Sequence, residues 1–170
     1  MASHFLAAEP NACLADFTGA DLMVPQLRGR DAATVIHELC DVLQKAALVP
    51  DLLPFYQATL NREFLLGSTV SHGIALPHAR VVGLARLAFA LGRTAEPLVW
   101  VSRDNPPVRL VLLCAVPATE AAAYLLLTSG LAHLAREPHL LEALLQAPGS
   151  SAMWNALRQV KLGRSKPPPW

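Results

Sequence analysis

Hydrophobic residues recur at helical spacing in the first half of the chain. One apolar stripe between residues 31 and 47 is formed by Ile36, Leu39, Leu43 and Ala46. This spacing places the four side chains on one face of a helix. Asp31 can cap the start of that helix, and Pro50 stops it from continuing. The pattern therefore predicts an amphipathic helix over residues 31–47.

A second helix is expected over about residues 51–64. Its inward face is predicted to carry Leu53, Tyr56 and Leu60. Arg62 and Glu63 then fall in its last turn. An arginine at this place can simply favour the helix C-terminus, so its position alone does not indicate a site.

Short apolar runs in the second half of the chain predict strands. Residues 84–91 and 98–101 suit two strands, with residues 92–97 as the connection between them. A turn signal rich in polar residues and proline follows at 103–107. The nearly continuous apolar run over 108–116 is typical of a central strand that is buried on both faces.

Helical patterns return after this run. A long and almost wholly apolar helix is predicted over 119–136, followed by shorter helices over 138–147 and about 150–160. The expected capping residues of the first and last of these are Thr119 and either Ser150 or Ser151. Helices, then strands, then further helices indicate an α/β or α+β sandwich.

The two ends of the chain lack this regularity. Residues 1–30 show no sustained periodicity, and we expect a partly irregular leader there, although Leu22–Val24 could add a strand. Residues 161–170 form a proline-rich tail that we expect to be flexible. A chain of 170 residues suits one domain, which we expect over residues 31–160.

Composition narrows the class of protein. The chain is 53% hydrophobic and 16% charged, and 14 Lys and Arg against 13 Asp and Glu give no basic excess for nucleic acid. The most apolar region, Leu110–Ala135, is interrupted by polar residues and proline, so no membrane insertion is expected. Three scattered cysteines, an odd number, argue against a disulfide framework and favour a cytoplasmic location.

The segment Gly67–Arg80 carries the candidate chemistry. Pro77 has a fixed φ and restrains Leu76, so His78 leaves a stiff segment at a defined angle. The hydroxyls of Ser68 and Thr69 and the guanidinium of Arg80 lie close in sequence. An imidazole nitrogen can accept a phosphoryl group, whose oxygens such groups would hold. The alternative is that His78 is an ordinary loop residue.

Three motifs in this order carry a family resemblance: Asn61–Glu63, Gly67–Thr69 and Gly73–Arg80, the last reading Gly-Ile-Ala-Leu-Pro-His-Ala-Arg. Together they resemble the enzyme IIA domains of the bacterial phosphotransferase system, of the fructose/mannitol type that includes nitrogen-regulatory IIA proteins. The resemblance runs from about residue 31 to 160 in segment order. It implies a mixed sheet of about five strands flanked by helices on both faces. It also implies a phosphohistidine on Nε2 of His78 and an Arg62 guanidinium that helps hold the phosphoryl group.

One position departs from the family pattern. These domains usually carry a second active-site histidine early in the long helix, where this chain has Tyr124. A tyrosine can donate one hydrogen bond but does not become a cation near neutral pH. Tyr124 could therefore replace the histidine, weaken transfer, or mark a protein that has lost transfer; it could also be a core aromatic. His72 is a candidate replacement donor to the phosphate.

The resemblance leads to two functional hypotheses. The first is a phosphohistidine carrier, a component of a protein-phosphohistidine phosphotransferase, that accepts its group from HPr or a nitrogen-branch HPr-like protein. It would serve regulation or sugar uptake, with a IIB domain or a regulated protein downstream. The second is an interaction module that keeps the fold without transfer. A coincidental match in an unrelated α/β protein is a third possibility. No cofactor is implied, and no ligand spacing indicates a metal.

Overall fold

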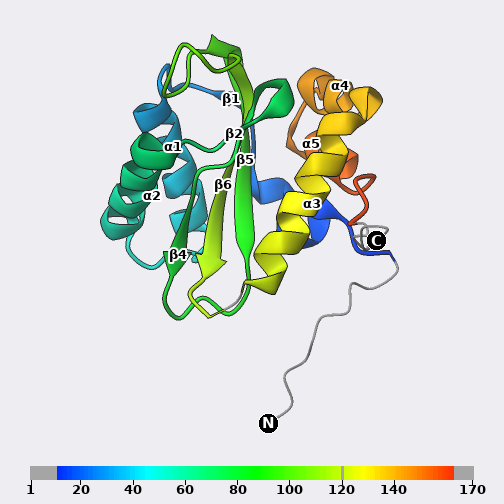
Figure 1. The fold of residues 1–170 in the computed structure, drawn as a ribbon. Helices are drawn as coiled ribbons and strands as arrows, with labels where there is room; N and C mark the ends of the chain where they lie inside the picture. The colour runs from blue at the N-terminus through cyan, green and yellow to red at the C-terminus, as the bar shows by residue number, and fades with distance from the viewer. Residues whose placement is uncertain (1–10, 120, 163–170) are drawn as a thin grey trace, which may run out of the picture.

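The computed structural model describes residues 11–119 and 121–162, in which a mixed β-sheet lies between two layers of helices (Figure 1). The strands run in the order β1-β5-β6-β3-β2, and β4 pairs with β6. Their bounds are β1 Met23–Leu27, β2 Thr69–Val70, β3 Ile74–Ala75, β4 His78–Val81, β5 Ala88–Leu98 and β6 Val108–Pro117. Strands β1 and β5, β3 and β6, and β4 and β6 are parallel, whereas β5 and β6 are antiparallel.

Helices cover both faces of this sheet, which confirms the predicted α/β sandwich (Figure 1). On one face lie α1 Ala32–Lys45 and α2 Leu52–Leu66, and on the other lie α3 Ala122–Arg136, α4 Pro138–Gln146 and α5 Ser150–Leu157. The predicted stripe of α1 is buried, and the Asp31 side chain accepts a hydrogen bond from Thr34 N at 2.8 Å. Burying this stripe holds α1 against the sheet, because apolar area leaves water.

The central strand is β6, as its continuous apolar run predicts. Of its ten residues only Arg109 is not fully buried. The thiols of Cys40 and Cys114 are buried in the core. Burial raises the pKa of Cys40 to about 12, so this thiol stays neutral and packs as a small hydrophobic group.

The prediction of two short strands around residues 92–97 is wrong. Residues 88–98 form one long strand, β5, and the predicted connection lies inside it. Gly92 suggested a turn, but its role is close packing: a Cβ there would lie 2.5 Å from the Leu27 side chain on β1. A glycine inside a strand can mark the close approach of a neighbour as well as a turn.

The predicted inward face of α2 is only partly right. Tyr56 and Leu60 pack against the core, but Leu53 is 60% exposed. The buried positions are instead Phe55, Thr59 and Glu63. Apolar residues occur on several sides of this helix, so its periodicity does not select one face.

Two predicted helix caps are also corrected. Helix α3 begins at Ala122 after Ala121, without a side-chain cap, so Thr119 does not cap it. Helix α5 follows Gly149, and Ser150 is its first residue. The Ser150 hydroxyl donates a hydrogen bond to the Met23 carbonyl at 3.2 Å, which ties α5 to β1. The Ser150 hydroxyl, which the local pattern assigned to capping, is thus used in a tertiary contact.

The segment before residue 30 contributes to the core. Leu14, Leu22 and Leu27 are buried, and β1 is the edge strand beside β5. Near the other end, Leu162 is buried and its N–H donates to the Ala12 carbonyl at 2.9 Å. Residues 1–10 of the predicted leader and 163–170 of the predicted tail lie outside the described residues.

An arginine on β5 fastens one edge of the sheet to the helices. Nε of Arg93 donates to the Pro25 carbonyl at 2.9 Å. Its Nη1 lies 2.9 Å from each of three carbonyl oxygens at the end of α4, those of Leu144, Leu145 and Ala147. A cation at a helix C-terminus also interacts favourably with the helix dipole.

Candidate functional site

Two glycines shape the segment that leads to His78. Gly67 ends α2 with a φ of +59°, and Gly73 has a φ of +74°. A Cβ at Gly73 would lie 2.9 Å from the Pro107 carbonyl oxygen, so a larger residue would both strain the backbone and crowd it. The chain then passes through β3 and Pro77 and enters β4 at His78.

The ring of His78 is fixed by the backbone two residues before it. Nδ1 lies 3.0 Å from the Leu76 carbonyl oxygen. A carbonyl oxygen only accepts, so Nδ1 carries the proton and Nε2 keeps its lone pair. The main chain around His78 is also anchored, because Cys114 N on β6 donates to the Pro77 carbonyl at 2.9 Å. The arrangement leaves the lone pair of Nε2 free.

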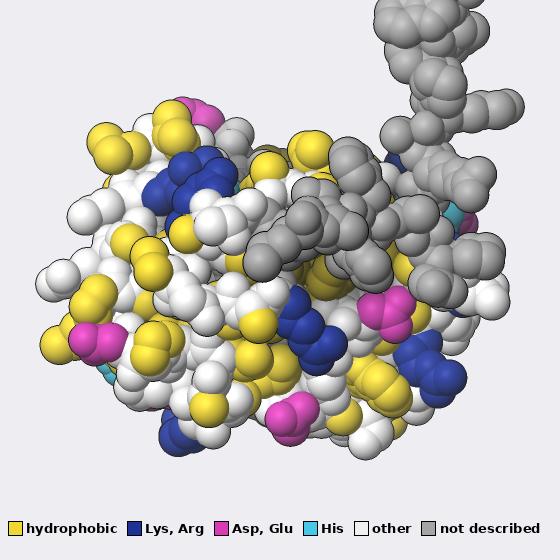
Figure 2. Space-filling view, turned by 90° about the horizontal axis from the view of Figure 1, so that it is seen from below, with side chains coloured by type: hydrophobic (Ala, Val, Ile, Leu, Met, Phe, Trp, Pro, Cys, Tyr) yellow, Lys and Arg dark blue, Asp and Glu magenta, His cyan; other side chains and the backbone are white. Residues whose placement is uncertain are grey.

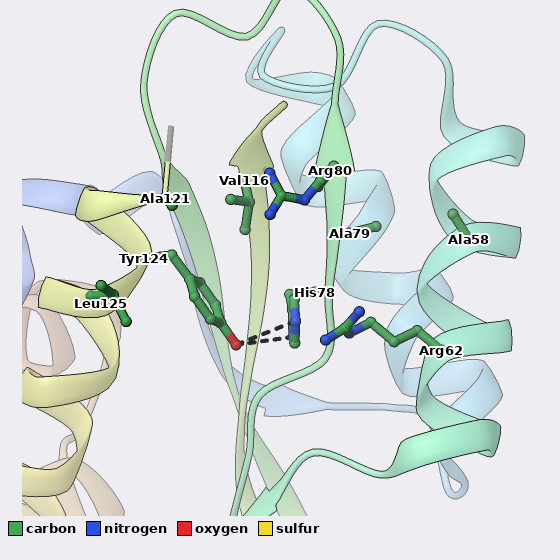
Figure 3. A pocket seen from close by; sticks show the side chains of 9 residues that line it. All are labelled: Ala58, Arg62, His78, Ala79, Arg80, Val116, Ala121, Tyr124 and Leu125. Atoms are coloured by element: carbon green, nitrogen blue, oxygen red, sulfur yellow. Dashed lines mark hydrogen bonds between the residues drawn. The ribbon is translucent and has the colours of Figure 1, made fainter. Parts of the chain in front are cut away.

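Tyr124 faces this nitrogen from α3 (Figure 3). Its hydroxyl oxygen lies 3.2 Å from Nε2 and 3.5 Å from Nδ1, and the two ring centroids are 4.9 Å apart. Since Nδ1 donates to Leu76, the hydroxyl donates to Nε2. Burial raises the pKa of Tyr124, and this keeps the hydroxyl protonated and able to donate.

His78 opens into a cavity of about 380 Å³ between α2 and α3. Its lining residues are Ala58, Arg62, His78, Ala79, Arg80, Val116, Ala121, Tyr124 and Leu125. The Arg62 guanidinium points towards the His78 ring from α2, opposite Tyr124 (Figure 3). Arg80 Nη1 donates to the Ala118 carbonyl at 3.1 Å, which holds that guanidinium at the cavity. Two guanidinium cations therefore lie at the same cavity as the His78 ring.

The electrostatic setting favours a neutral imidazole. Burial lowers the pKa of His78, and the positive charges of Arg62 and Arg80 act in the same direction. The hydrogen bond to the Leu76 carbonyl and the negative charge of Glu63 oppose this lowering. Only the neutral ring has a free nitrogen lone pair, so the site keeps His78 in its nucleophilic form near neutral pH.

Comparison with known proteins identifies the family. The family model described as "Phosphoenolpyruvate-dependent sugar phosphotransferase system, EIIA 2" matches residues 16–160. The chain belongs to this family. The resemblance seen in the sequence is therefore confirmed, and a coincidental match in an unrelated α/β protein is excluded.

Relatives come from both branches of this EIIA family. The fructose-specific EIIABC component of Bacillus subtilis is 31% identical over 135 residues, which are 78% of this chain but only 21% of that protein. A nitrogen regulatory protein of Bradyrhizobium diazoefficiens is 25% identical over 146 residues, covering 85% of this chain and 94% of that one. The crystal structure of nitrogen regulatory protein IIA-Ntr from Neisseria meningitidis has the same fold, with a TM-score of 0.73 at 20% identity; the match covers 85% of this chain and 98% of that one.

The remaining predicted phosphate ligands of this EIIA chain lie outside the residues that line the cavity. The Ser68 hydroxyl donates to Glu63 Oε2 at 2.6 Å, so it is already engaged in the protein. Thr69 lies in β2, and the exposed His72 has a φ of +67° in the turn before β3. Their proposed contact with a phosphoryl group stays a prediction. Arg62, Arg80 and Tyr124 lie together with His78 at the cavity.

Sequence reasoning did not assign a role to Glu63 or Trp100. Glu63 is 2% exposed, and its carboxyl oxygens accept hydrogen bonds from Ser68 N, Ser68 Oγ and Trp100 Nε1. The Arg62-Glu63 pair was part of the motif, but only its arginine received a function. The sequence offered one signal for this role: Glu63 lies five positions before Ser68, at the end of a predicted helix. The tryptophan lies too far along the chain to be linked to it by pattern.

Within residues 11–119 and 121–162 there is no group of three or more His, Cys, Asp and Glu side chains placed to hold a metal ion. In the same residues no helix has the length and apolar character needed to cross a membrane.

Proposed function

We propose that this EIIA chain is a phosphocarrier that accepts a phosphoryl group on Nε2 of His78. The observation that carries the proposal is the hydrogen bond of Nδ1 to the Leu76 carbonyl, which leaves the lone pair on the nitrogen that faces the cavity. Burial lowers the pKa of His78 and so supports a neutral nucleophile.

The step balances as a transfer between two imidazoles. The Nε2 lone pair forms a new N–P bond while the N–P bond of the donor phosphohistidine breaks and its electron pair returns to the donor ring. A loose transition state places most of the negative charge on the three equatorial oxygens. Arg62 and Arg80 would neutralise that charge from two sides. Tyr124 would turn its hydroxyl from Nε2 to a phosphoryl oxygen as the bond forms.

The proposed donor is HPr or its nitrogen-branch relative, and it would dock over the cavity mouth. Leu125 in the cavity lining is 67% exposed, and Val82, just after β4, is 86% exposed. Figure 2 shows the end of the molecule seen from below in Figure 1, where hydrophobic side chains lie among separated basic and acidic groups. A docking face of this kind would bury apolar area around the reacting nitrogens. Downstream, a IIB domain or a regulated protein would receive the signal or the group.

The test is intact-protein mass after incubation with phosphoenolpyruvate, enzyme I and HPr, and separately with the nitrogen-branch donors. We expect one acid-labile phosphoryl group on the wild type. His78→Ala should remain unmodified, whereas His72→Ala, which removes an exposed histidine outside the cavity lining, should still be modified. An unmodified wild type with both sets of donors, or a phosphorylated His78→Ala, would contradict the proposal.

The second candidate function is an interaction module without transfer, and the observation that favours it is Tyr124. A neutral hydroxyl now occupies a place where the family usually has a histidine, and it caps Nε2 at 3.2 Å. Tyr124→His separates the two candidates. If the wild type is unmodified and Tyr124→His accepts a phosphoryl group, the module is favoured. If both proteins accept it, the phosphocarrier is favoured, and Tyr124 is either a working part of the site or a bystander.

A further inference from the structure

We propose that Glu63 is a positioning residue for His78 and that it acts through a chain of hydrogen bonds across Ser68 and Leu76. The importance of this chain for transfer rests on the proposed function, in which His78 accepts the phosphoryl group. Glu63 itself lies outside the residues that line the cavity. Its influence therefore reaches the histidine through the intervening backbone and through its charge.

The chain begins at a buried anchor. Glu63 Oε1 accepts from Trp100 Nε1 at 2.6 Å and from Ser68 N at 3.0 Å, and Oε2 accepts from Ser68 Oγ at 2.6 Å. Trp100 is itself only 5% exposed. Three donors fit within the acceptor capacity of the two oxygens of a carboxylate. They tie the end of α2 to the loop after it and to the segment after β5.

The next link is between Ser68 and Leu76. Leu76 N lies 3.1 Å from the Ser68 carbonyl oxygen and 3.2 Å from Ser68 Oγ, so its N–H donates to both. The carbonyl of the same Leu76 accepts from His78 Nδ1 at 3.0 Å. Residue 77 is proline, which further limits Leu76. Two residues, Ser68 and Leu76, thus connect Glu63 to the nitrogen of His78 that decides the tautomer of the ring.

The chain has two consequences for His78. First, it holds the Leu76 carbonyl where it selects the Nδ1–H tautomer, which leaves Nε2 free. Second, the Glu63 charge raises the pKa of His78 against the lowering by burial and by Arg62 and Arg80. Among the residues that the structure describes, the titratable Tyr124 hydroxyl also faces the ring. A carboxylate in this place fixes the tautomer and moderates the effect of the arginines.

Glutamine tests the carboxylate at nearly constant shape. Glu63→Gln keeps one oxygen for Trp100 and Ser68 N, but its amide then donates towards the Ser68 hydroxyl and reverses that hydrogen bond. The matched control is Thr59→Val, one turn earlier on the same buried face of α2. Thr59 is fully buried, and its hydroxyl donates to the Phe55 carbonyl at 2.8 Å, away from the chain to His78.

The experiment is nitrogen-15 NMR of histidine-labelled full-length protein, followed by phosphorylation kinetics. In the wild type, Nδ1 of His78 should carry the proton. Glu63→Gln should shift the ring towards a mixture of tautomers, lower the pKa of His78 further and slow phosphoryl acceptance about tenfold. Thr59→Val should leave the tautomer, the pKa and the rate unchanged, even where it lowers the melting temperature equally.

The proposal is overturned if folded Glu63→Gln keeps the wild-type tautomer and the wild-type pKa of His78, whatever its rate of phosphoryl acceptance. If that variant does not fold, Trp100→Phe replaces it, because this change removes one hydrogen-bond donor from the Glu63 carboxylate. A smaller shift of the tautomer and pKa in the same direction supports the proposal. The absence of any shift overturns the proposal. The NMR readout needs no phosphoryl donor. A tautomer shift in a protein that no donor phosphorylates therefore supports positioning while the proposed function fails.

Discussion

Two arginine sites in this molecule use the same side chain in opposite ways. Arg93 on β5 meets four backbone carbonyl oxygens, each at 2.9 Å. Arg62 on α2 is exposed at the cavity beside His78, and among the described residues it makes no hydrogen bond or salt bridge. The Arg93 guanidinium donates to its own protein through Nε and Nη1, whereas the Arg62 guanidinium keeps its donors for a group outside the protein.

The contrast shows how to separate structural from functional polar groups. Donors that the fold already satisfies contribute to stability and are not available to a ligand. Charged donors that converge on a cavity without internal partners cost some stability and can bind an anion. The same reasoning applies to the Ser68 hydroxyl, a predicted phosphate ligand that donates to Glu63.

Replacing Arg93 should have the largest effect, and on stability. Arg93→Met leaves several buried carbonyl groups without a partner, so we expect the free energy of unfolding to fall by about 2–4 kcal/mol. Urea denaturation measures it. The control is Arg80→Met, an exposed arginine with one such bond, which should change stability by less than about 0.5 kcal/mol. If Arg93→Met and Arg80→Met lost equal free energies of unfolding, the structural role of Arg93 would be contradicted.

Replacing Arg62 should slow phosphoryl transfer and leave stability almost unchanged. Arg62→Gln should slow phosphoryl acceptance about 10- to 100-fold, because a charge that stabilises the transition state is lost. The free energy of unfolding should stay within about 0.5 kcal/mol of the wild type. Single-turnover transfer from phosphorylated donor gives the rate. Arg103→Gln, at an exposed position in the turn between β5 and β6, serves as control and should transfer normally.

Removing the Tyr124 hydroxyl should have a smaller effect. Tyr124→Phe keeps the ring against His78 and loses one hydrogen bond, so we expect acceptance to slow about fivefold. Tyr56→Phe, on the partly buried Tyr56 of α2, is the matched control and should be unchanged. A faster Tyr124→Phe would mean that the hydroxyl holds Nε2 back from reaction and does not assist the product.

The dependence of phosphoryl acceptance and stability on pH should be the smallest of these effects. Because the folded pKa of His78 is lowered, acceptance should be flat down to about pH 6.5, the ordinary imidazole value, and decline only below it. In that lower range the unfolded chain binds more protons than the folded one. Stability should therefore decrease as pH falls below about 6.5. His78→Gln should remove this contribution; an unchanged pH profile of stability in that variant would contradict it.

Much of the site could be found from sequence because its parts are local. Pro77 beside His78 signals a stiff segment in the sequence. The structure adds that Gly67 and Gly73, in the same segment, have a positive φ. The family resemblance brought in Arg62 and Tyr124, which lie with His78 at one cavity. What sequence missed depends on contacts between distant segments. No pattern near Trp100 in the sequence indicates that its indole N–H donates a hydrogen bond to Glu63.

The α1 stripe, the buried central strand β6 and the motif around His78 could be read from the amino-acid sequence, because they depend on period, burial and short-range backbone restraint. Three features depend on the folded chain: residues 88–98 form one strand, Glu63 faces inward and the Ser68 hydroxyl is engaged. Each of these follows from a neighbour far along the chain, such as Leu27 for Gly92 and Trp100 for Glu63. Local propensity is a weak preference, and the energy of packing and of buried hydrogen bonds outweighs it.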